Sequence, residues 1–386
     1  TLRLSLTPYP DIYPGKSQAT FTIAVEISGR DTGFPTTPPH WTRMLRACAM
    51  RIFDNNANVF AYRVSALTTD AGPLRHGEVI TGTAIGGTGN LGFADGFSHD
   101  GGALTTVFVD EGATPGGGTG TLIGASSGTT FTTDQRSANK ALGYAPQSDV
   151  NSQNTATIEI FTDGKKAKAK GCMGNVEFQF NHGDACVAQF TMQGIVQTGG
   201  YGDAVIPTDA YEGHKVPPTF LNTRLTLAST INNPLVANRY GTDTAGLEGS
   251  LSKVTLNSGN NVILQQNSLD VDGVQFALIT ERNPAGSFNP TEVQSSEFDF
   301  IARFILGTPA RLKILLGLTS HNDVGTADQN TFEFLAPGLT FTGLADQDRD
   351  GINVWDASFA CGGGDYDTSV LGELPGNDNE FIMVHR

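Results

Sequence analysis

The sequence has few charged residues, and most of those it has are acidic. Of 386 residues only 16% are charged, and 24 Lys and Arg face 39 Asp and Glu, for a formal net charge of −15. Proteins that grip nucleic acid do so through clustered cations on their surface. The shortage of cations therefore excludes a basic phosphate-binding surface as the main feature of this chain.

Cysteine is scarce, and so are long apolar runs. The four cysteines are Cys48, Cys172, Cys186 and Cys361. No two of them form a C-x-x-C pair, which argues against a zinc knuckle, and four in a chain of this length do not make a disulfide scaffold. We expect reduced, mostly buried thiols, as in a protein made in the cytoplasm. No stretch approaches ~18 consecutive apolar residues, so we predict no membrane span.

Catalytic signatures are also missing. The sequence has no G-x-S-x-G and no pair of histidines at H-x-x-x-H spacing. A G-x-G-x-x-G pattern at 87–92 runs into Phe-Ala-Asp-Gly at 93–96, which does not start a helix as a dinucleotide site requires. Carboxylate pairs that meet only in the fold stay open. Aromatic residues are 9% of the chain with two Trp, which is sparse for a sugar-binding groove. We predict no catalytic residues, no cofactor and no enzyme.

One acidic segment resembles the start of a calcium loop. Asp346, Asp348 and Asp350 precede Gly351 at the spacing of an EF-hand, but Ala357 stands where that loop has its bidentate Glu. Asp and Gly are ordinary turn residues. We therefore predict an Asp-rich turn and no metal site, with these three carboxylates as a weak alternative.

Glycine, at 47 residues, is what the sequence has in excess. A composition rich in Gly and Thr favours strands and turns over long helices. Phe21, Ile23 and Val25 alternate with polar residues, which predicts a half-buried strand. Asp163-Gly164 predicts a tight hairpin inside a four-stranded meander over 155–197. The sequence therefore predicts an all-β fold of β-sandwich or barrel domains, with a further strand in the aromatic segment at 298–301.

A single short amphipathic helix is predicted over about 39–50. Trp41, Met44, Leu45 and Cys48 lie at i, i+3, i+4 and i+7, which places them on one face of a helix. Core packing against a sheet is the simplest role of such a face, so we predict these four residues as the helix packing face.

Length and composition predict two domains. At roughly 100–200 residues per domain, 386 residues suit two. A Gly-, Thr- and Ser-rich segment at about 67–148 is predicted as an insertion of extended loops with one or two hairpins. A proline-containing, weakly apolar segment at 200–220 is predicted as the linker. The domains are thus 1–210 and 211–386, which match in element type without an exact sequence repeat.

Seven short segments of the chain resemble, in the same order, sequence motifs of a known family. They are 41–49, 155–161 with the turn at 163–165, 170–176, 190–194, 217–218, 346–353 and 380–384. In this order they resemble motifs of the tail tube proteins of long-tailed bacteriophages. The first resembles that family's W-x-x-L-L-R-A-C-G helix, and the last its closing strand. Met173 stands where an Arg is common in the family, and the insertion at 67–148 departs from its shorter members.

This resemblance implies a structural virion protein with two tandem tail-tube-like domains. Such subunits close into rings, of three chains with pseudo-sixfold symmetry or of six chains, and the rings stack into a hollow tube. The implied partners are further copies of the chain, a tape-measure protein, and tail terminator and tip proteins, with assembly in the host cytoplasm. DNA would pass through the lumen without specific binding, which the acidic composition suits. The alternatives are a decoration or baseplate protein and a tail-associated polysaccharide hydrolase.

Overall fold

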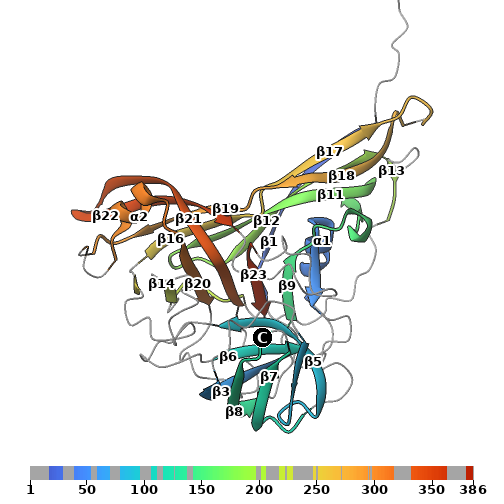
Figure 1. Cartoon of the computed structure of the whole chain (residues 1–386). Helices are drawn as coiled ribbons and strands as arrows, with labels where there is room; N and C mark the ends of the chain where they lie inside the picture. Colours follow the sequence, from blue (N-terminus) through green and yellow to red (C-terminus); the bar gives the residue numbers. More distant parts are fainter. Residues whose placement is uncertain are drawn as a thin grey trace, which may run out of the picture.

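The computed structural model of the chain is built mostly from antiparallel strands (Figure 1). It describes residues 17–28, 39–53, 59–69, 79–95, 106–110, 116–125, 127–136, 142–196, 201–205, 217–221, 224–228, 247–248, 251–270, 272–293, 295, 298–316, 332–362 and 380–385. Two α-helices and a single 3-10 turn, η1 (Val150–Ser152), lie among these strands in the described ranges. The prediction of an all-β fold is confirmed.

The main sheet joins fifteen strands of the described residues. Its central path runs through β1 (Gln18–Glu26), β12 (Val187–Val196), β11 (Lys165–Asn181), β16 (Leu251–Asn257), β19 (Ala285–Pro290), β22 (Ile352–Gly362), β21 (Phe332–Arg349), β20 (Ala310–Leu316), β14 (Arg224–Ala228) and β15 (Leu247–Glu248). Five strands pair beside this path: β2 (Met50–Phe53), β9 (Leu142–Pro146), β10 (Ala156–Thr162), β13 (Gly202–Asp203) and β23 (Ile382–His385).

The core of this sheet is aromatic and comes from both halves of the chain. Phe178 and Phe180 of β11 have ring centroids 6.0 and 6.4 Å from that of Phe332 of β21. All three are almost fully buried. Alternate residues of β11 point inward, as the period-2 pattern of a strand with one buried face requires. One continuous core therefore lies beneath the strands of both halves.

The strands on either side of residue 210 pair directly. Residues 177–181 of β11 pair with 253–257 of β16, and β23 pairs with β9. The first and second halves thus share one sheet and one core in the described residues. The division into domains at 1–210 and 211–386 stays a prediction, and most of the predicted linker lies outside the described residues.

Two hairpins turn on Asp-Gly pairs. Asp163 and Gly164 have φ of 47° and 75°, and they join β10 to β11. Asp350 and Gly351 have φ of 56° and 84°, and they join β21 to β22. Positive φ at both central residues is the type I′ geometry that matches the twist of the flanking strands. The hairpin predicted at Asp163-Gly164 is confirmed, but the four-stranded meander predicted over 155–197 is wrong, because β11 is one continuous strand and the described part of this segment has three strands.

The first helix, α1 (Thr42–Ala47), is shorter than the span predicted over 39–50. It ends because Cys48 and Ala49 leave the helix and Ala49 takes a φ of 53°. Trp41, Leu45 and Cys48 are buried in the main core, and Met44 is half-buried against it. The indole Nε1 of Trp41 also donates to the carbonyl oxygen of Ser28 at 3.0 Å.

A second helix, α2 (Phe300–Leu306), lies where a strand was predicted at 298–301, so that prediction is wrong. Phe298 and Phe300 suggest alternation, but the local capping signals decide otherwise. Asp299 accepts a hydrogen bond from the backbone N–H of Ala302 at the N-cap, and Gly307 closes the helix with a φ of 61°. An Asp before and a Gly after seven residues are the start and stop of a helix.

The extended loops with one or two hairpins predicted over 67–148 are also wrong, because the strands between 59 and 136 close into a six-stranded barrel and 142–146 joins the main sheet. The barrel contains β3 (Val59–Thr69), β4 (Val79–Gly82), β5 (Gly87–Asp95), β6 (Thr106–Asp110), β7 (Gly120–Gly124) and β8 (Thr130–Arg136). Its own small core includes Tyr62, Ile80, Val107, Leu122 and Phe131. Each strand contributes only a few apolar residues to this core, so the core is difficult to predict from the sequence of any one strand.

The barrel is inserted between two paired strands. Residues 50–53 of β2 pair with 143–146 of β9, so the chain leaves the main sheet and returns to it at neighbouring positions. Figure 1 shows the barrel as a separate body beside one side of the main sheet. The former G-x-G-x-x-G candidate at 87–92 falls in β5, a barrel strand paired on both edges.

Candidate assembly surfaces

Among the described residues there is neither a metal-binding cluster nor an exposed thiol. Across those residues, no three His, Cys, Asp or Glu side chains are placed to hold a metal ion. All four cysteines are free and buried. Burial raises the pKa of the Cys186 and Cys361 thiols to about 12, and it raises the pKa of Cys48 further. Because the thiolate is the nucleophile, these groups are inert at neutral pH.

The acidic segment at 346–351 closes a hairpin. An Oδ1 of Asp348 accepts a hydrogen bond from the backbone N–H of Gly351 at 2.9 Å, and Asp350 occupies the first turn position. Asp346 lies two residues before Asp348 on β21. The geometry of the segment is therefore that of a capped two-residue turn.

Three lysines at the start of β11 form ion pairs with two acidic residues on neighbouring elements. The Nζ atoms of Lys166 and Lys168 lie 3.6 and 3.0 Å from Oε1 of Glu159 on β10. The hydrogen bond between Glu159 and Lys168 holds the pKa of Glu159 below its usual value, and the positive charge of Lys166 adds a smaller effect in the same direction. Lys170 lies 3.4 Å from Asp272. These lysines hold strands together and do not form an unpaired cationic surface.

The main sheet contains a structural repeat that sequence comparison of the two halves does not reveal. In the first unit, β1, α1, β10, β11 and β12 follow in chain order, and the strands pair in the order β1-β12-β11-β10. In the second unit, β19, α2, β20, β21 and β22 follow in chain order, with pairing β19-β22-β21-β20. All these pairs are antiparallel. The two units have the same topology, with the barrel inserted in the first.

The junction between the units is made by the chain that precedes β19. Strand β16 pairs with β11 of the first unit on one edge and with β19 of the second unit on the other. The hairpin of β17 (Asn260–Gln266) and β18 (Val274–Arg282) then packs on the sheet of the first unit, where Ala277 and Ile279 contact Met173 and Ala49. The segment before β19 thus completes the first unit.

The outer edge of β1 has no partner strand in the described part of the chain. Val196 donates its backbone N–H to the carbonyl of Ser17, and Ile27 donates to Cys186, so the odd-numbered residues of β1 bond to β12. Antiparallel pairing alternates, so the even-numbered residues direct their N–H and C=O groups outward. Gln18, Thr20, Thr22, Ala24 and Glu26 therefore form an open, nearly uncharged edge.

The distal part of β21 presents a second open edge. Strand β20 pairs with β21 only as far as Leu339, and no described strand borders 344–348 on that side. Arg349 and Ile352 flank the two-residue turn as a hydrogen-bonded pair, so Leu344, Asp346 and Asp348 direct their backbone groups outward. Its counterpart in the first unit, 177–181 of β11, is the stretch that pairs with β16.

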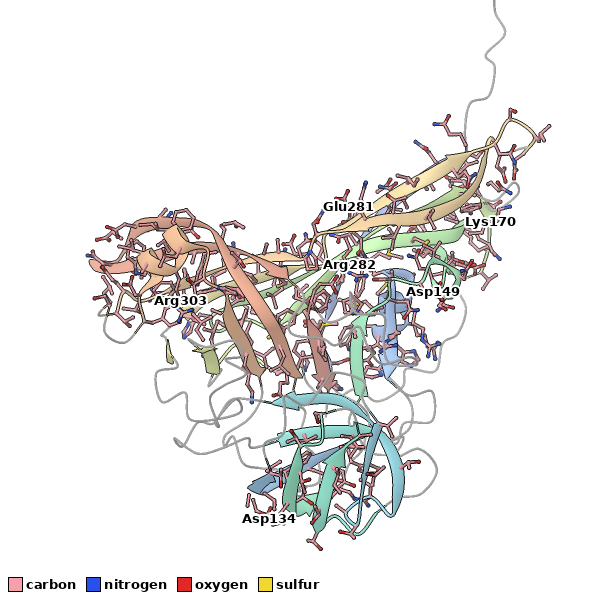
Figure 2. All side chains as sticks on the ribbon, in the orientation of Figure 1. Asp134, Asp149, Lys170, Glu281, Arg282 and Arg303 are labelled. Atoms are coloured by element: carbon pink, nitrogen blue, oxygen red, sulfur yellow. The ribbon has the colours of Figure 1, made fainter. Side chains whose placement is uncertain are left out.

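An apolar helix face lies beside this second edge. Ile301, Ile305 and Leu306 of α2 are 51%, 73% and 75% exposed, and α2 packs on β21 through the contact of Phe300 with Phe341. Figure 2 shows Arg303 of this helix at the opposite end of the sheet from Lys170. The guanidinium of Arg303 lies over the ring of Phe298, so it is folded against the helix. Sequence reasoning missed this face because it predicted a strand.

Comparison with known proteins does not identify the chain: no family model and no curated protein matches it. Within the described residues, no helix is long and apolar enough to cross a membrane. The assignment of function therefore rests on the repeat, the open edges and the sequence motifs.

Proposed function

We propose that this chain is the subunit of a bacteriophage tail tube, a structural virion protein that assembles with copies of itself into stacked rings. The observation that carries the proposal is the repeat of two units with open strand edges on β1 and on distal β21. A sheet with unsatisfied edges at two different places is suited to head-to-tail association with further copies.

The repeat gives a physical route to a ring. Within one chain, the first unit is joined to the second through a continuous sheet. If the second unit of one copy is joined in the same way to the first unit of the next, successive units are related by one rotation. Three chains then supply six equivalent units, which is the ring with pseudo-sixfold symmetry that the resemblance implies. Closure of the sheet removes every open edge from the ring.

The surface chemistry fits a tube that conducts DNA. The net charge of −15 repels phosphates, and Lys166, Lys168 and Lys170 of β11 lie in ion pairs with Glu159 and Asp272. A lumen with this balance lets DNA slide without binding. Its further partners would be a tape-measure protein in the lumen and terminator and tip proteins at the two ends.

The test is negative-stain electron microscopy of the purified chain at rising concentration, with and without isolated tail tips as nuclei. We expect hollow tubes with a regular axial repeat, formed either spontaneously or as extensions of the tips. Monodisperse particles that neither polymerise nor extend the tips would overturn the proposal. Binding of the chain to capsids instead would favour a decoration protein.

A further inference from the structure

Helix α2 has the only helix face in the described residues that carries several exposed large apolar residues. Ile305 and Leu306 form the end of α2, and Ile301 lies one turn earlier. The segment after the helix, 307–309, is exposed as well, and from 301 to 309 the one charged residue is Arg303. Contiguous exposed apolar surface of this kind marks an interaction site.

The first unit shows what covers the corresponding helix end. There, the amide Nδ2 of Asn260 donates to the carbonyl oxygen of Cys48, at the end of α1, and to that of Gly174 on β11, at 2.7 and 3.0 Å. Ala49 is buried under Ile279 of the β17–β18 hairpin. The end of α1 is therefore covered by the chain segment that precedes the first strand of the following unit.

In the part of the chain that the structure describes, no third unit follows the second. In a head-to-tail assembly its following unit is the first unit of a second copy, whose first strand is β1. The segment that precedes β1 is 1–16, which lies outside the described residues. In sequence, Leu2, Leu4 and Leu6 alternate with polar residues there. The five residues from 2 to 6 match in number the five residues of β11, 177–181, that β16 covers.

We propose that residues 2–6 of a second copy add as a strand to the open edge at 344–348 of β21, where their leucines cover the exposed face of α2. Backbone groups of Leu344, Asp346 and Asp348 supply the edge, and the side chains of Ile305 and Leu306 supply the apolar contact. This inference rests on the proposed tube function and names the segment that links one copy to the next.

Cross-linking between two variants that each carry one introduced cysteine tests the proposal. The four native cysteines are buried, so a short bismaleimide reacts at the introduced thiol. Leu306→Cys and Leu4→Cys chains are mixed and assembled into tubes. We expect a cross-linked species of twice the chain mass. A Val150→Cys chain replaces the Leu4→Cys chain as the control, since Val150 is exposed on η1, and its neighbour Asp149 lies at the opposite end of the sheet from Arg303 of α2 (Figure 2).

The outcomes separate the inference from the proposed function. Tubes without a cross-link between the Leu4→Cys chain and the Leu306→Cys chain, or an equal yield with the Val150→Cys control, would overturn the inference alone. Failure of the unmodified chain to form tubes or extend tips would overturn the proposed function. A triple Leu2→Ser, Leu4→Ser, Leu6→Ser variant should melt like the unmodified monomer yet need roughly tenfold or more protein to assemble, because each lost leucine contact weakens association.

Discussion

At the scale of single residues, the open edge of β1 can be altered without touching its pairing to β12. Thr22 directs its backbone N–H outward, and its side chain is exposed. Proline lacks this N–H and is tolerated on edge strands where the N–H faces solvent. We predict that Thr22→Pro leaves the melting temperature of the monomer within a few degrees but abolishes tube growth, measured by light scattering.

Thr22→Val is the matched control, because it keeps the backbone N–H and nearly the same side-chain volume. It should assemble like the unmodified chain. Equal growth of the Thr22→Pro and Thr22→Val variants would show that this edge is not used in assembly.

A buried ion pair makes a second prediction at this scale. Nζ of Lys313 on β20 lies 3.1 Å from Oε1 of Glu333 on β21, and both side chains are almost completely buried. Removing one partner leaves the other charge buried without a counter-charge, which lowers the free energy of unfolding by about 3–5 kcal/mol. We expect Lys313→Met to lower the free energy of unfolding by that amount in a urea titration.

The double variant Lys313→Met, Glu333→Met should recover most of the loss, because no charge is then left unpaired. If Lys313→Met alone cost less than about 1 kcal/mol, typical of an exposed pair, the burial of this pair would be contradicted.

At the scale of elements, turns and helix ends are determined by a few neighbouring residues and can be predicted from them. Asp163-Gly164 predicted its hairpin because only a few residue types tolerate positive φ at both turn positions. The region of α2 was predicted as a strand because Phe298 and Phe300 alternate, whereas the capping by Asp299 and Gly307 overrides that short pattern. The alternation of two residues is a weaker signal than a start and a stop at helical spacing.

The barrel was missed for a different reason. Its core residues, such as Tyr62, Val107 and Phe131, come from strands separated by long stretches of Gly, Thr and Ser. Only β3, where Phe60, Tyr62 and Val64 alternate, shows a buried face, and each other barrel strand supplies at most two core residues. The open edges of β1 and β21 are equally unreadable from sequence, because strand pairing is set by contacts far apart in the chain.

The barrel should be removable as a unit. Phe53 of β2 pairs with Gly143 of β9, so a Gly-Ser linker of a few residues can replace 54–141. We predict that this deletion leaves a folded main sheet that still forms tubes, of smaller outer diameter in electron micrographs. Loss of folding would contradict the separation of the two cores, and a folded chain that no longer assembles would place the barrel in the contacts between copies.

At the scale of the whole molecule, the proposed function depends on a relation that no single element contains. Two units of the same topology lie in one sheet, and the second unit keeps open the edge that the first unit has filled. A chain with this asymmetry tends to fill the open edge with another copy. Because the contact is heterologous, the assembly either closes into a ring or continues as a filament.

The most direct measurement is cryo-electron microscopy of the assembled chain, with averaging of end-on views. We predict a hollow ring of six similar lobes that repeats after every second lobe, with a mass per ring of three chains of 40.7 kDa each. A solid filament, or a ring whose lobes are not related in pairs by the internal repeat, would contradict this prediction.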